Sequence, residues 1–227
     1  MIIELTGIPG AGKSTVLNSL QNWQETKAFV FDIQGYILNN LMLPLKGKIG
    51  YELVLLTHIF LLKQRDWHLF QRVFLLVKGS GNTFFHKINI LRNTLKKLII
   101  YNFIKDRDEI FLIDEGVTHI PFTVFVDVNR KINETEFNAF LNLIPSVDAL
   151  LIIDAPDKVL TQRVLKRGGE GHRRINFSVH SDVIAFMQQS RSVLEKIKKH
   201  FKGCVYQNIE KDIDTHKIIE ILGLMSR

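Results

Sequence analysis

The sequence has a single cysteine, Cys204, which excludes an intrachain disulfide and a cysteine-based metal site. This scarcity is typical of proteins of the reducing cytoplasm, where we expect the chain to be located. The longest apolar stretch, residues 53–62, is interrupted by Thr57 and His58 and is too short to span a bilayer. The first residues contain no basic, apolar leader, so we expect no signal peptide.

Signatures of several other protein classes are missing as well. The eight histidines are scattered, and no pair has a metal-ligand spacing beside an acidic partner, so we interpret them as surface or core residues. The chain has no internal repeat and no low-complexity tail. It contains neither the Asn-Lys-x-Asp motif of guanine-binding proteins nor a Leu-Ser-Gly-Gly signature, which disfavours two large classes of NTPase.

Acidic residues are scarce in the segment 33–105, where eleven lysines and arginines accompany only Glu52 and Asp66. The segment therefore carries a net charge of +9, and the remainder is −2 because the whole chain is +7. Such asymmetry indicates an anionic partner: a phosphorylated substrate, nucleic acid or a membrane surface. We interpret the Trp and Phe residues of this segment as core and its lysines as a solvated face. A membrane or nucleic-acid contact is the alternative.

The most informative feature present is the segment 7–15, GIPGAGKST, directly after the apolar residues 1–5. This is the P-loop pattern G-x-x-x-x-G-K-[ST] in a strand-to-helix context. Its glycines let backbone N–H groups point at phosphate oxygens, and the following helix adds the positive end of its dipole. We predict that Lys13 contacts the β- and γ-phosphates and that Ser14 binds Mg²⁺. The predicted nucleotide-binding residues of this loop are Gly7, Pro9, Gly10, Ala11, Gly12, Lys13, Ser14 and Thr15.

A second chemical element is the apolar segment 110–113, which ends in the acids Asp114 and Glu115. A Walker B strand has this form, because an Asp at the carboxyl end of a strand beside the P-loop can hold Mg²⁺. We therefore predict Asp114 as a metal ligand. Glu115 is predicted to polarise a water or an acceptor hydroxyl. The alternative is an ordinary acidic turn after a strand.

Asp32 ends another apolar segment, residues 28–31. The carboxyl ends of strands line the ligand crevice in open α/β sheets. A carboxylate there could accept the proton of an attacking hydroxyl, which is the role of a general base in phosphoryl transfer. The alternative role is a helix N-cap or a turn residue.

Arg163 and Arg167 are four residues apart and therefore share one helical face. The glycine-rich break 168–171 follows them, and Arg173 and Arg174 come after it. Arginines on such a segment could close over a triphosphate and stabilise charge in the transition state, so we predict both as catalytic and Arg163 also as nucleotide-binding. The alternative is a solvated basic helix end.

The order of apolar segments predicts the architecture. Five short runs are continuously apolar, as expected for parallel strands covered on both faces: 2–5, 28–31, 110–113, 149–153 and 204–206. Helical patterns lie between or after them, at 13–21, 133–143, 157–167, 178–200 and 215–224. This alternation predicts an α/β fold, a doubly wound parallel sheet with helices on both faces. The segment 33–105 holds two or three helices and no strand.

Taken together, these segments resemble the nucleoside and nucleotide kinase group of P-loop kinases, especially thymidylate-kinase-like proteins. The resemblance rests on GIPGAGKST, FLIDEG, IDAPDKVLTQRVLKRGG and CVYQNIEKDIDTHKIIEIL, which cover about half of the chain. It implies a three-layer P-loop NTPase fold with five parallel strands in the order 2-3-1-4-5, and ATP as donor. It also implies a single domain, 1–227, with a helical acceptor-side insertion at about 33–105 and a lid at about 163–178. By position, Asp32 would match the acceptor-side carboxylate.

The chain departs from such kinases at two places. They usually place Asp-Arg after the third strand, where this chain has Asp114 and Glu115, and the usual Glu-Pro after the second strand is absent. We expect an ATP- and Mg²⁺-dependent kinase acting on a small, anionic acceptor; an apolar alcohol is also open. The alternatives are a regulatory NTPase in which Glu115 positions water, and an ATP-switched protein of membranes or nucleic acid. A homodimer is possible.

Overall fold

The structure, a computed structural model, describes residues 1–22, 29–40, 52, 57–81, 83–127, 131–166, 180–201, 204–207 and 214–222. Its first half contains β1 (Ile2–Thr6), α1 (Lys13–Asn22), β2 (Phe29–Val30), α2 (Ile33–Asn40), the 3₁₀ helix η2 (His58–Leu61), α4 (Gln64–Lys78) and α5 (Phe84–Ile104). Its second half contains β3 (Ile110–Asp114), the 3₁₀ helix η3 (Val117–His119), α6 (Ile120–Phe125), α7 (Glu134–Leu141), β4 (Ala149–Asp154), α8 (Asp157–Lys166), α9 (His180–Phe201), β5 (Cys204–Gln207) and α10 (Thr215–Ile221).

The strands form one parallel sheet in the order β2-β3-β1-β4-β5, so β1 lies at its centre. The order is the one that the family resemblance implied. Four strands have four to six residues, whereas β2 has only two, which pair with Ile110 and Phe111 of β3. The second strand is thus a short edge strand, shorter than the predicted 28–31. In register, Leu5 of β1 lies beside Asp114 on one side and Leu151 on the other.

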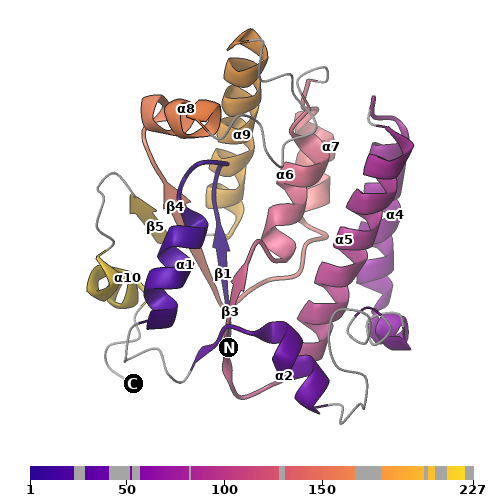
Figure 1. Cartoon of the computed structure of the whole chain (residues 1–227). Coiled ribbons are helices and arrows are strands. Elements are labelled where there is room, and N and C mark those ends of the chain that lie inside the picture. The colour runs from indigo at the N-terminus through magenta and orange to yellow at the C-terminus, as the bar shows by residue number, and fades with distance from the viewer. Residues whose placement is uncertain are drawn as a thin grey trace.

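Helices cover both faces of the sheet (Figure 1). Right-handed crossovers place the β1–β2 connection on one face and the β3–β4 and β4–β5 connections on the other. Accordingly, α1 and α10 pack together on one face, and α6 and α9 pack together on the other. The core between these layers is apolar, with Leu5, Phe111 and Ile152 fully buried. The parallel α/β class predicted from the sequence is therefore confirmed.

The segment 33–105 contributes α2, η2 and a long antiparallel hairpin of α4 and α5. One face of the hairpin joins the core through Leu69, Val73 and Leu98. The interpretation of its aromatic residues as core is wrong for several of them. Phe60 is 91% exposed, Phe84 is 70% exposed and Phe85 is 81% exposed. Within the described residues, no helix is both long enough and apolar enough to cross a membrane.

Two features of the expected site fall outside the described residues. These are Arg167 and most of the expected lid, 163–178, of which only the end of α8 is described. The side chain of Cys204 is likewise outside the description, although its backbone belongs to β5.

Candidate active site

The loop between β1 and α1 is held open by glycines in conformations that other residues rarely adopt. Gly7, Gly10 and Gly12 have φ values of +156°, +87° and +95°. A Cβ on Gly7 would lie 2.2 Å from the carbonyl oxygen of Ile153 in β4, so the loop packs too closely on the sheet for any side chain. Lys13 begins α1, and its Nζ donates a hydrogen bond back to the carbonyl of Gly7 at 3.1 Å. The backbone thus curls around the lysine at the helix N-terminus.

The remaining loop residues divide into packing and accessible groups. Ala11 is buried and its N–H donates to Ile8, whereas Pro9 is half-buried. Ser14 and Thr15 are exposed in the first turn of α1. The hydroxyl of Ser14 is therefore accessible to a metal bound beside the loop.

Glu115, immediately after β3, joins the P-loop lysine to a histidine. Its Oε1 lies 3.1 Å from Lys13 Nζ, and its Oε2 lies 3.6 Å from His119 Nε2. Glu115 has φ +55°, so the chain turns sharply at the edge of the sheet. Burial opposes its ionisation, but the charges of His119, Lys13 and Lys97 outweigh it and lower the pKa of Glu115 to about 2. The carboxylate is consequently a firmly ionised anchor for Lys13.

A buried carboxylate from β1 fixes the turn that carries Glu115. Glu4 is fully buried, and it accepts hydrogen bonds from the backbone N–H of Val117 at 2.8 Å and of Thr118 at 2.9 Å. The Thr118 hydroxyl donates a third bond at 2.6 Å. A Cβ on Gly116 would lie 2.1 Å from Glu4 Oε1, so glycine is needed where the carboxylate reaches the turn. Burial raises the pKa of Glu4 above its ordinary value, although these hydrogen bonds oppose the shift.

Asp114 ends β3 beside the P-loop strand, and its residue is exposed. Partial burial and the charge of Glu115 raise its pKa, against the effect of Lys13 and Lys97. Within the described residues, no group of three or more His, Cys, Asp or Glu side chains is arranged to hold a metal. The exposed Ser14 and Asp114 nevertheless fit Mg²⁺, which commonly takes one or two protein oxygens and completes its shell with phosphate and water.

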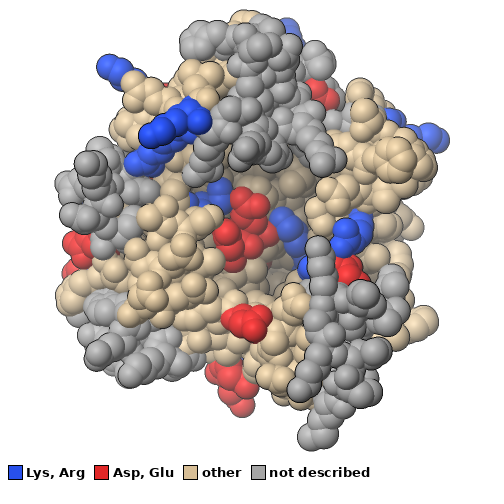
Figure 2. Space-filling model, viewed as in Figure 1, with Lys and Arg blue, Asp and Glu red and all other residues tan. Residues whose placement is uncertain are grey.

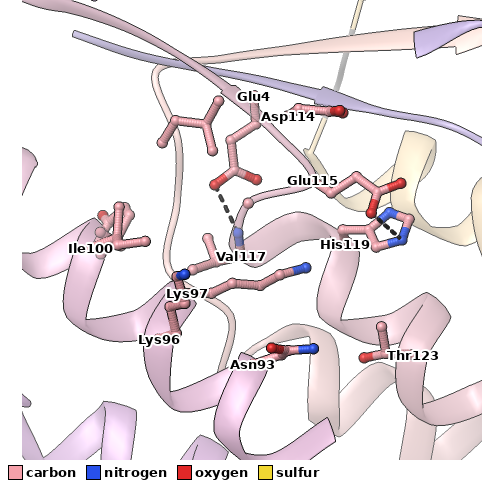
Figure 3. A pocket seen from close by; sticks show the side chains of 13 residues that line it. Glu4, Asn93, Lys96, Lys97, Ile100, Asp114, Glu115, Val117, His119 and Thr123 are labelled. Carbon is pink, nitrogen blue, oxygen red and sulfur yellow. Dashed lines mark hydrogen bonds and ion pairs between the residues drawn. The ribbon is translucent and has the colours of Figure 1, made fainter. Parts of the chain in front are cut away.

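A cavity of about 350 Å³ opens beside this turn, between the end of β3 and α5 (Figure 3). One wall is formed by residues 113–117 with Glu4, and His119 and Thr123 add to it. The other wall is one face of α5, at helical spacing: Asn93, Lys96, Lys97, Ile100 and Tyr101. In Figure 2, acidic side chains gather in a hollow near the centre of the face, with basic side chains on both sides.

Lys97 is the cation that points from α5 into this cavity (Figure 3). Burial lowers its pKa, although Glu115, Glu4 and Asp114 attract the proton. Within the described part of the chain, its ammonium has no hydrogen bond and no ion pair shorter than 4 Å. The neighbouring Lys96 lies 3.7 Å from Glu52. The cavity thus contains one ammonium, that of Lys97, whose nearby carboxylates Glu115, Glu4 and Asp114 all lie beyond ion-pair distance.

Asp32 lies two residues after β2 and acts as the cap of α2. Its Oδ1 accepts a hydrogen bond from Gly35 N–H at 2.8 Å, and its carbonyl accepts one from Tyr36 N–H at 2.9 Å. The alternative recognised in the sequence, a helix N-cap, is therefore the geometry observed. The residue is exposed at the carboxyl edge of the sheet, and the role of general base stays a prediction.

Arg163 reaches the P-loop from α8. Its Nη1 donates to the carbonyl oxygen of Gly10 at 3.3 Å, and the same helix packs Val164 against that glycine. The predicted position of Arg163 beside the nucleotide loop is consistent with this contact. Arg191 of α9 fixes the adjoining edge of the sheet, because its guanidinium donates to both carboxylate oxygens of Asp154 and to Asp157.

The sequence reasoning missed three residues of this site: Glu4, Lys97 and His119. Glu4 interrupts an apolar strand, and a lone acid in a central strand is a signal for a buried, hydrogen-bonded carboxylate. Lys97 lies on a polar face of α5. In the sequence it stood out only as one of the many basic residues of the segment 33–105. His119 is four residues after Glu115, a spacing that brings the two together on a helical turn.

No family model and no curated protein matches the sequence significantly. Solved structures do align with the chain. The deoxyadenosine kinase from M. mycoides with bound dATP is 16% identical, with a TM-score of 0.46 and coverage of 100% of each chain. TT1252 from Thermus thermophilus is 15% identical, with a TM-score of 0.45, and the alignment covers 100% of this chain and 98% of that one. The M. mycoides enzyme with dCMP and dCDP is 17% identical, with a TM-score of 0.44, and the alignment covers 98% of this chain and 97% of that one.

Proposed function

We propose that the chain is a Mg²⁺- and ATP-dependent phosphotransferase, a thymidylate-kinase-like P-loop kinase that acts on a small anionic acceptor. The observation that carries this proposal is the position of Glu115. It contacts Lys13 of the P-loop on one side and lines the cavity beside α5 on the other. An acceptor in this cavity would lie next to the end of a triphosphate on the loop, as in-line transfer requires.

On the donor side, backbone N–H groups of the loop and the N-terminus of α1 bind the phosphates. Lys13 neutralises the β- and γ-phosphates, and Ser14 and Asp114 hold the metal. Mg²⁺ supplies charge neutralisation of the phosphate oxygens when it is bound. Arg163, which already contacts Gly10, and Arg167 add positive charge from the lid side. Catalysis on this side is positioning and charge stabilisation.

On the acceptor side, Lys97 is the group that selects an anion. Its ammonium has lost part of its hydration in the cavity, so an anionic ligand restores a partner that water no longer provides. Asn93 and Thr123 line the same cavity and offer hydrogen bonds to a hydroxyl-bearing ligand. Asp32 is the proposed general base. Glu115, which contacts Lys13 and lines the cavity, is proposed to polarise a water or the acceptor hydroxyl.

The second candidate is an NTPase that hydrolyses its nucleotide as a switch. The contact of Glu115 with Lys13 favours it, because a carboxylate after the metal-binding Asp can orient a water. Hydrolysis does not require a second ligand, however, and so gives no role to the cavity or to Lys97.

The deciding experiment is Mg²⁺-dependent ATP turnover by the purified chain, alone and with nucleosides, nucleotides, sugars, sugar phosphates and lipid alcohols. Transfer to one acceptor well above background hydrolysis supports the kinase, and hydrolysis unaffected by every acceptor supports the switch. Lys13→Ala should reduce either turnover at least about 100-fold. Lys158→Ala, on the exposed side of α8, is the matched control and should leave turnover unchanged. Turnover retained by Lys13→Ala would exclude the P-loop as the site.

A further inference from the structure

Within the described residues, five of the nine large apolar side chains that are exposed lie at the end of the α4–α5 hairpin. We define the hairpin tip as residues 72–81 and 83–92, the last turns of α4 and the first turns of α5. Its exposed apolar residues are Phe74 (46% exposed), Leu75 (58%), Phe84 (70%), Phe85 (81%) and Ile88 (47%). Large apolar side chains exposed together mark interaction surfaces, whereas single ones are ordinary.

The two helices hold these residues at one end of the molecule. Lys87 Nζ donates to the carbonyl oxygen of Lys78 at 3.0 Å, which ties the first turns of α5 to the end of α4. The rings of Phe84 and Phe85 lie edge to face, with centroids 5.9 Å apart. In Figure 1 the tip lies at the end of the molecule toward which the strands point. The P-loop and the cavity beside α5 follow the carboxyl ends of those strands.

The charged residues within the tip sequence itself all have one sign. The sequence contains no Asp or Glu between Asp66 and Asp106. Within the tip, the basic residues are Arg72, Lys78, Lys87 and Arg92. Of these, Arg92 is paired with Glu52 at 2.6 Å, and within the described residues the other three have no ion pair to an acid. The tip therefore combines apolar side chains with a net positive charge.

We propose that the hairpin tip docks on an anionic lipid bilayer, with its Phe, Leu and Ile side chains in the interface and its lysines and arginine on the lipid headgroups. Apolar burial and attraction to anionic lipid are the two contributions that hold a peripheral protein on a membrane, and the tip offers both. Docking in this orientation turns the P-loop edge of the sheet toward the lipid surface. This inference does not depend on the chemistry that the site performs.

The chemistry of the tip favours lipid over two other partners. A second copy of the same tip would bring like charges together, which opposes a symmetric dimer through this surface. Single-stranded nucleic acid binds by stacking bases on aromatic rings, but Leu75 and Ile88, which are exposed on the same tip, cannot stack. Acyl chains, in contrast, accept aliphatic and aromatic side chains alike.

The test is flotation of the full chain with phosphatidylcholine vesicles, with and without phosphatidylglycerol. We expect binding to the anionic vesicles, weaker binding to the neutral ones, and loss of binding as salt is raised. The double variant Phe84→Ser, Phe85→Ser should bind at least about tenfold more weakly. Lys78→Glu with Lys87→Glu should weaken binding to the anionic vesicles at least about tenfold, with little change on the neutral ones. Ile184→Ser, 40% exposed on α9, is the matched apolar control and should bind like the wild type.

A second readout separates insertion from adsorption. Phe85→Trp should show a blue shift of its emission on anionic vesicles, measured against the wild-type tryptophans, because the indole leaves water. No binding to either vesicle, or binding unaffected by the Phe variants, would overturn the proposal. The proposal would also be overturned if a single-stranded oligonucleotide displaced the protein from the vesicles. It would equally be overturned if the wild type formed an oligomer in solution and the double Phe variant did not.

Discussion

Lys13 of the P-loop and Glu115 after β3 form an ion pair, with 3.1 Å between Nζ and Oε1. The pair joins two segments more than one hundred residues apart, and it exists because β1 and β3 are neighbours in the sheet. Glu115 also faces His119 and lines the cavity beside α5. One carboxylate therefore contacts both the P-loop lysine and the cavity. If the P-loop binds phosphates as proposed, they would compete with Glu115 for the ammonium of Lys13.

This competition predicts that Glu115→Gln binds ADP and ATP more tightly. The substitution removes a negative charge beside the phosphates and frees Lys13, and a partly exposed pair of this kind is worth about 1 kcal/mol or less, so we expect a gain of up to about fivefold. Isothermal titration with ADP measures it. Glu195→Gln removes a charge from the exposed pair with Lys198 on α9 and should leave affinity unchanged. Weaker binding by Glu115→Gln would mean that the carboxylate positions Lys13 for the phosphates.

Lys97→Gln should weaken binding of the anionic acceptor. A charge-assisted hydrogen bond in a cavity contributes about 1.5–3 kcal/mol, so the acceptor KM should rise roughly 10- to 100-fold while the KM for ATP changes little. Steady-state kinetics with the acceptor found in the turnover panel separate the two constants. Lys105→Gln, after the end of α5 and away from the cavity walls, removes the same charge and serves as control. An unchanged acceptor KM would exclude Lys97 from the acceptor site.

The sequence predicted the parts of this protein whose signals are local. The P-loop is recognisable because its glycines and Lys13 are consecutive, and β3 because Asp114 ends an apolar run. The cavity was not predictable in the same way. Its walls come from β1, β3 and α5, and only the order of strands in the sheet brings Glu4 and Lys97 to the same place. The exposed Phe84 and Phe85 were missed because composition does not tell which face of a helix is covered.

Asp32→Asn separates the two roles of that residue. Asn caps helices about as well as Asp, so the free energy of unfolding should change by only a few tenths of a kcal/mol. If the carboxylate is the general base, phosphoryl transfer should fall about 10²- to 10⁴-fold while ADP affinity is retained. Urea unfolding, ADP titration and turnover provide the three measurements. Transfer at the wild-type rate would leave Asp32 as a helix cap alone.

Glu4→Gln should change how the stability of the protein depends on pH. Burial raises the pKa of Glu4 in the folded state above its unfolded value, so the folded chain holds this proton more firmly. The stabilisation that follows is fully present below the unfolded pKa and is lost as pH rises through the folded pKa. The glutamine of the variant does not titrate, so the unfolding free energy of the wild type minus that of the variant should fall as pH rises above about 4.5.

Urea unfolding of both proteins across this pH range measures the difference. Glu109→Gln provides a control of opposite sign, because the Tyr36 hydroxyl donates to Glu109 at 2.8 Å and holds the pKa of that carboxyl below its ordinary value. For Glu109, the unfolding free energy of the wild type minus that of Glu109→Gln should rise as pH rises. A pH-independent difference for Glu4→Gln would mean that the hydrogen bonds from Val117 and Thr118 fully offset the cost of burying the charge.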